Sequence, residues 1–340
     1  MYLKHLFLEN YTVFEKLDFD MSPGINVLIG ENGTGKTHLL KLLYSACQST
    51  DIKVSFAQKL VQCMLPDGYR ISKLVHRGAK DTYIRIKGAS YSKEAYTSLG
   101  FATTNKKWDA FAENAEQWEN IFGGSNSVFI PAKEILSHSY NLPAAVAKNM
   151  VKFDDTYIDI INSAKIDMNS IDNSEDAADL LMIKPLEKFI GGEVFYDNKL
   201  DEFYIKKGSR KTEFNLEAEG VRKIALLWQL IKNGALQEGS VLFWDEPEAN
   251  INPVYIKTIV EILFNLQRKG VQVFITTHDY MLAKYFEVCK KDTDKLLFHS
   301  LSKSENGIVY ECSEKFASLK NNMIIKSFDE LLDEIYNFED

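Results

Sequence analysis

Residues 25–43 read INVLIGENGTGKTHLLKLL, and this stretch decides the fold of the chain. Residues 25–29 form a short apolar run rich in β-branched residues, and leucines recur at helical spacing from Lys36 onward. The loop between them matches GxxxxGK(S/T) at every position: Gly30, Glu31, Asn32, Gly33, Thr34, Gly35, Lys36 and Thr37. A strand before this motif and a helix after it are the context that a phosphate-binding loop requires.

The residue types of this loop suit a nucleoside triphosphate. Its glycines let backbone N–H groups turn inward around phosphate oxygens, and the following helix N-terminus adds its dipole. We expect Lys36 to bring a positive charge to the β- and γ-phosphates of ATP, and the Thr37 hydroxyl to bind Mg²⁺. The alternative, a glycine-rich turn with no ligand, leaves the agreement between motif and flanking pattern unexplained.

A second motif lies near residue 245, where the apolar run Val241–Trp244 ends in Asp245 and Glu246. One acid after a strand means little, but two adjacent acids after a phosphate loop match the needs of ATP hydrolysis. We expect Asp245 to hold Mg²⁺ and Glu246 to activate the attacking water. The alternative is a pair of ordinary surface acids.

A histidine follows the next apolar run along the chain. Residues 271–276 read as a buried strand, and Thr277, His278 and Asp279 come directly after it. If this strand neighbours the one ending at Asp245, His278 faces the same phosphate pocket and can contact the γ-phosphate or the water. The alternative is a histidine that only caps the following helix.

Strands alternate with helices at both ends of the chain, which predicts an α/β fold with a central, mostly parallel sheet. Period-2 alternation in the first 30 residues predicts an N-terminal antiparallel β subdomain. We expect residues 1–50 and 215–315 to form one ATPase head, split by a mixed, largely helical insertion over 51–214. Residues 316–340 read as an acidic helical tail.

Within the insertion, four segments have readable patterns. Residues 54–65 fit a strand or a helix, and 108–122 fit a helix. Residues 143–190 are mainly helical in pattern, with a break around 169–173. Residues 194–216 read as a three-stranded meander.

Composition sets limits on partners and location. The formal net charge of −8 disfavours a chain coated in nucleic acid but leaves a local basic groove open. The four cysteines form no CxxC pair, which favours free thiols in a reducing compartment. The N-terminus lacks the apolar core of a signal peptide, and no apolar run reaches about 18 residues. We therefore expect a cytoplasmic protein with no membrane partner.

The order of phosphate loop, DEPE strand and TTHD strand resembles the ABC-type ATPases, specifically the SMC/RecF/OLD-like branch. The resemblance covers roughly residues 1–46 and 215–285, and His278 stands where that family has its switch histidine. Residues 129–137, FIPAKEILS, look like a segment of stand-alone prokaryotic AAA-family ATPases, many of which belong to phage-defence systems. The resemblance implies an enzyme that hydrolyses ATP.

The resemblance also implies self-association, because such heads usually dimerise with ATP held between one phosphate loop and the partner's signature motif. Residues 217–223, EAEGVRK, stand at the signature position. Ala218 replaces the family's serine and Glu219 replaces a glycine, so only Gly220 matches. Arg222 or Lys223 would then supply charge to the partner's nucleotide. The alternative is a polar helix start with no role in trans.

Three functions remain open from the sequence. In the first, ATP-dependent dimers or oligomers control a separate effector protein, a nuclease or toxin, in antiviral defence. The second is a RecF-like DNA-repair ATPase, and the third and most remote is a transporter subunit. The basic residues that could contact DNA, or simply form solvated tips, are Lys106, Lys107, Lys206, Lys207, Arg210 and Lys211.

Overall fold

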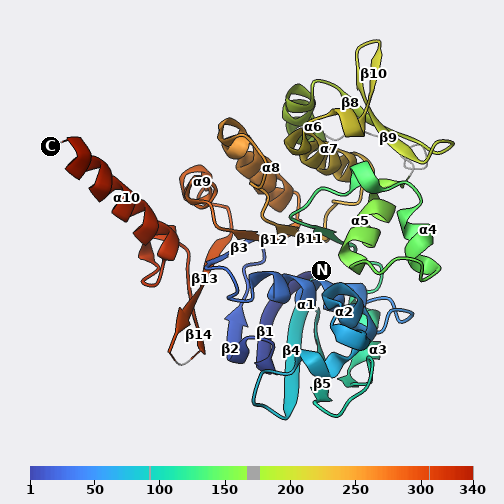
Figure 1. Cartoon of the computed structure of the whole chain (residues 1–340), viewed down its shortest axis with the longest axis vertical. Coiled ribbons are helices and arrows are strands. Elements are labelled where there is room, and N and C mark those ends of the chain that lie inside the picture. Colours follow the sequence, from blue (N-terminus) through green and yellow to red (C-terminus); the bar gives the residue numbers. More distant parts are fainter. Residues whose placement is uncertain (92, 167–176, 306, 340) are drawn as a thin grey trace.

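The computed structural model describes residues 1–91, 93–166, 177–305 and 307–339. The chain forms three β-sheets, and its helices lie between and around these sheets (Figure 1). The N-terminal sheet occupies one end of the view, and the small sheet occupies the opposite end. The C-terminal helix extends away from both.

The N-terminal sheet is antiparallel and has the strand order β2-β1-β4-β5-β6. Its strands are β1 (Tyr2–Tyr11), β2 (Phe14–Asp20), β4 (Asp81–Ser90), β5 (Lys93–Ala102) and β6 (Phe111–Glu113). The apolar alternation in β1 places Leu3, Leu6 and Leu8 in the core with no exposed surface. The predicted N-terminal antiparallel subdomain is therefore confirmed.

The central sheet has the order β14-β13-β3-β12-β11-β7, and all its pairings are parallel except that of β13 with β14. Its strands are β3 (Ile25–Gly30), β7 (Ser127–Ile130), β11 (Val241–Asp245), β12 (Gln272–Thr277), β13 (Leu296–Ser304) and β14 (Gly307–Ser313). Every residue of β3, β7, β11 and β12 is buried, because layers cover both faces of the sheet. This sheet confirms the predicted α/β class.

Two apolar cores lie on the two faces of the central sheet. Along β11, Val241 and Phe243 point into the core shared with the N-terminal sheet, whereas Leu242 and Trp244 point into the opposite one. The first core also holds α1 (Lys36–Gln48), α2 (Phe56–Met64) and α3 (Ala115–Phe122). The second core holds α5 (Asp155–Ala164), α6 (Ala177–Ile190), α7 (Glu219–Lys232), α8 (Ile256–Arg268) and α9 (Tyr280–Cys289).

The remaining elements lie at the periphery. A small antiparallel sheet has the order β10-β9-β8, with β8 (Glu193–Asp197), β9 (Glu202–Lys207) and β10 (Arg210–Glu213). The short helix α4 (Leu142–Ala147) precedes α5, and α10 (Met323–Glu339) projects from the body (Figure 1). The exposed face of α10 carries Leu331, Ile335 and Phe338.

The insertion differs in places from its sequence prediction. Residues 54–65 fit a strand or a helix by sequence, and the structure has a helix over 56–64. The three-stranded meander is confirmed as β8–β10, but it ends at Glu213, and residues 214–216 form a 3-10 turn. The helix predicted over 108–122 is wrong in its first part, because residues 111–113 pair with the edge of β5 and the helix begins only at Ala115. The break predicted around 169–173 lies outside the described residues.

The boundaries of the predicted domains stay a proposal, but the pairing shows how the pieces connect. β4 follows residue 50 and forms a long antiparallel ladder with β1. β7 likewise comes from the middle of the chain and pairs with β11 at the edge of the central sheet. Part of the predicted insertion therefore builds the two main sheets rather than a separate subdomain.

None of the helices in the described ranges combines the length and the apolar character needed to cross a bilayer.

One buried amide joins the two main sheets. Gln272 on β12 is 1% exposed, and its Nε2 donates to the carbonyl oxygens of Leu3 (2.8 Å) and Ser22 (2.7 Å). Its Oε1 accepts from the Leu3 N–H at 2.7 Å. An apolar residue here would leave the N–H and the carbonyl oxygen of Leu3 buried without this partner, whereas the Ser22 carbonyl would keep its hydrogen bond from Asn26 Nδ2 at 2.9 Å.

We therefore predict that Gln272→Leu lowers the free energy of unfolding by about 3 kcal/mol, because each orphaned buried group costs roughly 1–3 kcal/mol. Urea denaturation followed by circular dichroism measures this change. Gln237→Leu, on an exposed side chain, is the matched control and should change stability by less than about 0.5 kcal/mol. Equal effects of the two substitutions would contradict the role of Gln272.

Candidate functional site

The register of the central sheet brings the three sequence motifs to one edge. β12 lies between β3 and β11, and all three strands run parallel. Ile29, just before the phosphate loop, is paired with Thr277, and Asp245 is paired with Thr276. The loop over 30–37, the acids after β11 and His278 after β12 therefore leave the sheet side by side.

The phosphate loop has the backbone that its glycines allow. Gly30, Gly33 and Gly35 have φ values of 147°, 80° and 92°, in the region that favours glycine. A Cβ on Gly30 would lie 2.1 Å from the Leu301 carbonyl oxygen, and one on Gly35 would lie 2.7 Å from the Phe14 ring. Residues of β13 and β2 thus pack against the loop from two sides and hold its backbone conformation.

Lys36 folds back over this loop. Its Nζ donates to the carbonyl oxygens of Gly30 (2.8 Å) and Glu31 (2.9 Å), and the residue is 6% exposed. Burial lowers the pKa of Lys36 to about 8, although the nearby Glu246, Asp245 and Glu248 act in the opposite direction. The ammonium group therefore lies beside the loop. Phosphate oxygens of a bound nucleotide would replace the two carbonyl oxygens as its hydrogen-bond acceptors.

Oxygen atoms suited to magnesium meet next to the loop. The Thr37 hydroxyl lies 3.1 Å from both carboxylate oxygens of Asp245, and the Thr276 hydroxyl donates to the same carboxylate. Within the described ranges, no group of three or more His, Cys, Asp or Glu side chains could hold a metal ion. Thr37 and Asp245 fit Mg²⁺ as a pair, because this ion prefers few protein oxygens and completes its shell with phosphates and water.

Glu246 and His278 form the outer part of the site. Glu246 has a φ of 47°, which is unusual for a residue with a side chain, and its N–H donates to the Thr276 hydroxyl at 3.1 Å. Its Oε1 lies 3.4 Å from His278 Nε2, and the two side chains are 38% and 34% exposed. Burial, followed by the charge of Lys36, lowers the pKa of His278, so its neutral form is favoured.

The structure adds residues that the sequence analysis missed. Glu248 accepts hydrogen bonds from the Thr277 hydroxyl (2.7 Å) and the His278 N–H (3.2 Å), and burial raises its pKa. Thr276 bonds both to Asp245 and to the backbone of Glu246. The DEPE and TTHD strings contain these residues, but only the strand register shows that they meet.

A further cation approaches the loop from the β13–β14 hairpin. Lys303 Nζ lies 3.9 Å from a carboxylate oxygen of Glu31 and 3.8 Å from the position a Cβ on Gly33 would take. Nothing in the spacing of the motifs identifies this residue, because the hairpin returns to the loop only through the pairing of β13 with β3.

Gly220, Arg222 and Lys223 at the signature position have contacts inside this chain. A Cβ on Gly220 would lie 2.5 Å from the Asn250 carbonyl oxygen, so helix α7 packs closely on the loop after β11. Arg222 Nε donates to Glu134 at 2.7 Å, and Lys223 Nζ donates to the carbonyl oxygens of Glu246 (3.1 Å) and Ala249 (3.0 Å). Contact of Gly220 and Arg222 with a partner's nucleotide stays a prediction.

The arrangement can bind a triphosphate and direct a water at it. The loop and Lys36 meet the phosphate charge, Thr37 and Asp245 supply metal ligands, and Glu246 offers a carboxylate base beside a neutral imidazole. We predict a specific pH dependence from Lys36. Phosphate contacts favour its charged form, so a bound triphosphate raises its pKa and the protein takes up protons.

At pH 8 about half of Lys36 is neutral, because its pKa is about 8 in the free protein. ATP binding at that pH should take up as much as about half a proton, and affinity should fall as the pH rises from 7 to 9.5. Calorimetry in buffers of different ionisation enthalpy measures both the proton uptake and the affinity for ATP. Proton uptake on ATP binding should vanish at pH 6.5, where Lys36 is already charged. Affinity that rises with pH would contradict the assignment.

Comparisons with known proteins agree on the family. The family model described as "AAA domain, putative AbiEii toxin, Type IV TA system" matches residues 69–283, which is more than half of the chain. The DNA replication and repair protein RecF of Latilactobacillus sakei is 36% identical over 95 residues, 28% of this chain and 25% of the relative. The DNA double-strand break repair Rad50 ATPase of Methanosarcina acetivorans is 24% identical over 192 residues, 56% of this chain. The chain spans about a quarter of that RecF and 16% of that Rad50.

Solved structures show the same fold. An SMC head bound to the C-winged helix domain of ScpA aligns with a TM-score of 0.61 at 13% identity, over 92% of this chain and 98% of that one. The Smc head domain of Pyrococcus yayanosii aligns with a TM-score of 0.59 at 10% identity, over 97% and 99% of the two chains. The chain therefore belongs to the AAA-domain family that the matching model describes, within the SMC/RecF-like branch of the ABC-type ATPases.

Proposed function

We propose that this chain binds ATP with Mg²⁺ at the described edge of the central sheet and hydrolyses the ATP. The observation that carries the proposal is the meeting of Lys36, Thr37, Asp245, Glu246 and His278 at the ends of three paired parallel strands. A bound Mg²⁺ would neutralise charge on the phosphate oxygens. ATP binding is also the expected property of the family to which the chain belongs.

Each side chain then has a distinct task. Lys36 releases the two loop carbonyls and binds phosphate oxygens, with its charge restored by the ligand. Glu246 orients the attacking water and accepts its proton. His278, held neutral and 3.4 Å from Glu246, donates a hydrogen bond to the γ-phosphate or fixes the water.

We further propose that the ATP-bound form associates with a second copy. Glu246 and His278 are each more than one-third exposed, so one chain alone leaves the γ-phosphate side of the site open to water. A second copy would close that side, and loss of the γ-phosphate on hydrolysis would release it. Gly220 and Arg222 of the second copy are the proposed contacts, with Arg222 first leaving Glu134.

We propose that this cycle controls a separate effector protein, a nuclease or toxin, in prokaryotic antiviral defence. The name of the matching family, which includes a toxin of a type IV toxin–antitoxin system, supports a defence setting. The likeness of residues 129–137 to stand-alone defence ATPases supports it as well. In the structure, Glu134 from this segment pairs with Arg222 at the start of α7, which links it to the proposed dimer contact.

The second candidate is a DNA-binding repair ATPase, which the likeness to RecF and Rad50 favours. The predicted basic residues on β9 and β10 are only partly free for this role. Lys207 pairs with Glu217 at 2.6 Å, and Lys211 pairs with Asp197 at 3.4 Å. Lys206 and Arg210 on the same hairpin are exposed. Because half of this cluster is already neutralised, we rank DNA binding below control of an effector.

Glu246→Gln tests hydrolysis and self-association together. The substitution keeps the size of the side chain but removes the base, so ATP should still bind while the rate of turnover falls roughly 10²- to 10⁴-fold. The mass of the variant, measured by light scattering, should double or rise further on addition of ATP and Mg²⁺. Lys36→Ala is the control and should show neither binding nor a change in mass.

An unchanged turnover rate in Glu246→Gln would refute the role of Glu246. A mass that does not respond to ATP, in a variant that binds it, would refute self-association and leave the binding site intact.

The two candidate functions differ in their response to DNA. For control of an effector, we predict an ATPase rate that changes less than about twofold on addition of duplex or single-stranded DNA at 50 mM salt. For DNA repair, DNA should raise the rate strongly, and 200 mM salt should remove most of that effect because each phosphate contact adds to the salt dependence. Strong, salt-sensitive stimulation would overturn our ranking.

A further inference from the structure

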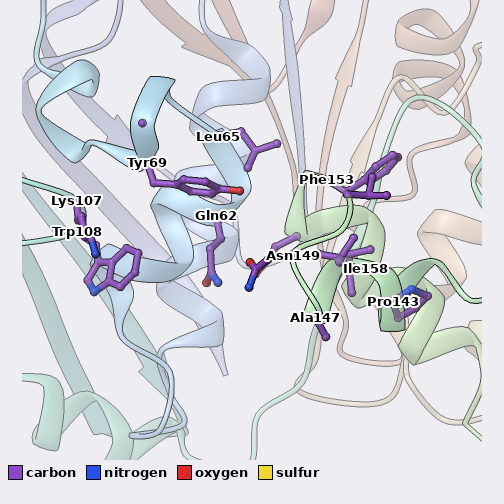
Figure 2. Close-up of a pocket in the computed structure, with 14 residues that line it drawn as sticks. Gln62, Leu65, Tyr69, Lys107, Trp108, Pro143, Ala147, Asn149, Phe153 and Ile158 are labelled. Atoms are coloured by element: carbon purple, nitrogen blue, oxygen red, sulfur yellow. The ribbon is translucent and has the colours of Figure 1, made fainter.

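We propose that a cavity between α2 and helices α4 and α5 binds a nucleobase together with its phosphate. The cavity has a volume of about 520 Å³, within the range that takes a nucleotide-sized ligand. Its walls come from α2 and the following turn on one side and from residues 143–158 on the other (Figure 2). No residue of the ATP site lines it, so this proposal stands apart from the proposed hydrolysis.

Two aromatic side chains offer surfaces for stacking. Figure 2 shows the Tyr69 ring extending into the gap between the two walls, with Trp108 nearby. Trp108 is 38% exposed, whereas Trp118, Trp228 and Trp244 are at most 2% exposed. An exposed tryptophan beside a cavity is an open flat surface, which every nucleobase can stack on.

Two amides stand where they can contact the edge of a base. Gln62 projects from α2, and Asn149 faces it from the opposite wall (Figure 2). In the part of the chain that the structure describes, neither side-chain amide has a hydrogen-bond partner. Each amide offers both a donor and an acceptor, the combination that the polar edges of nucleobases require.

The charges around the cavity favour an anion. Lys107 Nζ lies 5.7 Å from the centre of the Trp108 ring, and Lys152 Nζ lies 4.5 Å from that of Tyr69. The described residues give neither lysine an ion pair with a carboxylate. Asp155 is the acid that lines the cavity, and its carboxylate lies 3.0 Å from Lys59 Nζ, which also pairs with Asp159 at 2.6 Å. A phosphate attached to the stacked base would therefore meet two cations.

Backbone strain gathers at the same place. Of the twelve described non-glycine residues with positive φ, four line this cavity: Leu65 (47°), Tyr69 (52°), Lys107 (46°) and Asn149 (56°). Leucine, tyrosine and lysine rarely adopt this region. Leu65 adopts this conformation as the C-cap of α2, whereas at Tyr69, Lys107 and Asn149 the left-handed backbone sets the direction of an aromatic, a basic and an amide side chain that line the cavity.

A base with a phosphate could come from a free mononucleotide or from a single strand of nucleic acid. The experiment separates the two sources. The Lys36→Ala variant of the full chain, whose ATP site should be empty, is titrated with AMP, GMP, CMP and UMP and, in parallel, with ten-residue oligonucleotides A10 and U10. Because Trp108 is the exposed tryptophan, its fluorescence reports on the cavity.

We expect saturable quenching by at least one of these ligands. In the same background, Tyr69→Ala should weaken binding roughly 5- to 100-fold, the range for loss of one stacking partner. Asn149→Ala should weaken it roughly 2- to 10-fold, the range for loss of one hydrogen bond. Phe111→Ala, a matched control on an aromatic residue that is 68% exposed and outside the cavity, should leave the affinity unchanged. Circular dichroism confirms that each variant is folded.

Binding of a mononucleotide would assign the site to a free nucleotide, and binding of the oligonucleotides alone would assign it to a single strand. The absence of quenching by all six ligands would overturn the proposal without any variant being needed. Equal affinity in the parent, Tyr69→Ala and Asn149→Ala would overturn it as well, because binding would then lie elsewhere.

Discussion

The hydrogen bonds around Thr276 are the interaction on which the candidate site depends. This hydroxyl donates to the Asp245 carboxylate and accepts from the Glu246 N–H, so one side chain of β12 fixes the carboxylate at the end of β11 and the backbone of the acid that follows it. The parallel pairing of β12 with β3 places the phosphate loop on its other side. A slip of one residue in either pairing would turn these side chains to the opposite face and separate them. The apolar side chains that these strands bury on both faces of the sheet keep the register.

The same region concentrates charge in a poorly solvated place. Lys36, Lys223 and Glu248 are largely buried, and burial shifts the pKa of each toward its neutral form. Lys36 and Lys223 bind backbone carbonyl oxygens, whereas Glu248 binds a hydroxyl and an N–H at the end of β12. A bound triphosphate would give Lys36 the counter-charge that it lacks. Lys223 extends this network to α7, so the helix proposed to meet a second copy is tied to the loop that carries Glu246.

The sequence predicts this site better than it predicts the rest of the chain. Lys36, Thr37, Asp245, Glu246 and His278 could be chosen because each stands at a fixed offset from a strand end, and the structure brings all five together. Thr276, Glu248 and Lys303 could not, because their roles depend on pairing between strands far apart in the chain. The structure of the insertion over residues 51–214 was harder to predict from the sequence. The sequence pattern predicts a helix for residues 111–113, but these residues form a strand because they pair with the edge of β5. The cavity beside Trp108 joins segments from both sides of β7, which no local pattern reveals.

The most direct test of the account is the affinity of the wild-type chain for ATP, measured by calorimetry with Mg²⁺ and again with the metal chelated. The account predicts binding that the metal strengthens at least about tenfold, which corresponds to roughly 1.4 kcal/mol. It also predicts that Asp245→Asn removes this dependence on the metal, because Asp245 is the carboxylate beside Thr37. A folded chain with no measurable affinity for ATP or any other nucleoside triphosphate in the presence of Mg²⁺ would contradict it.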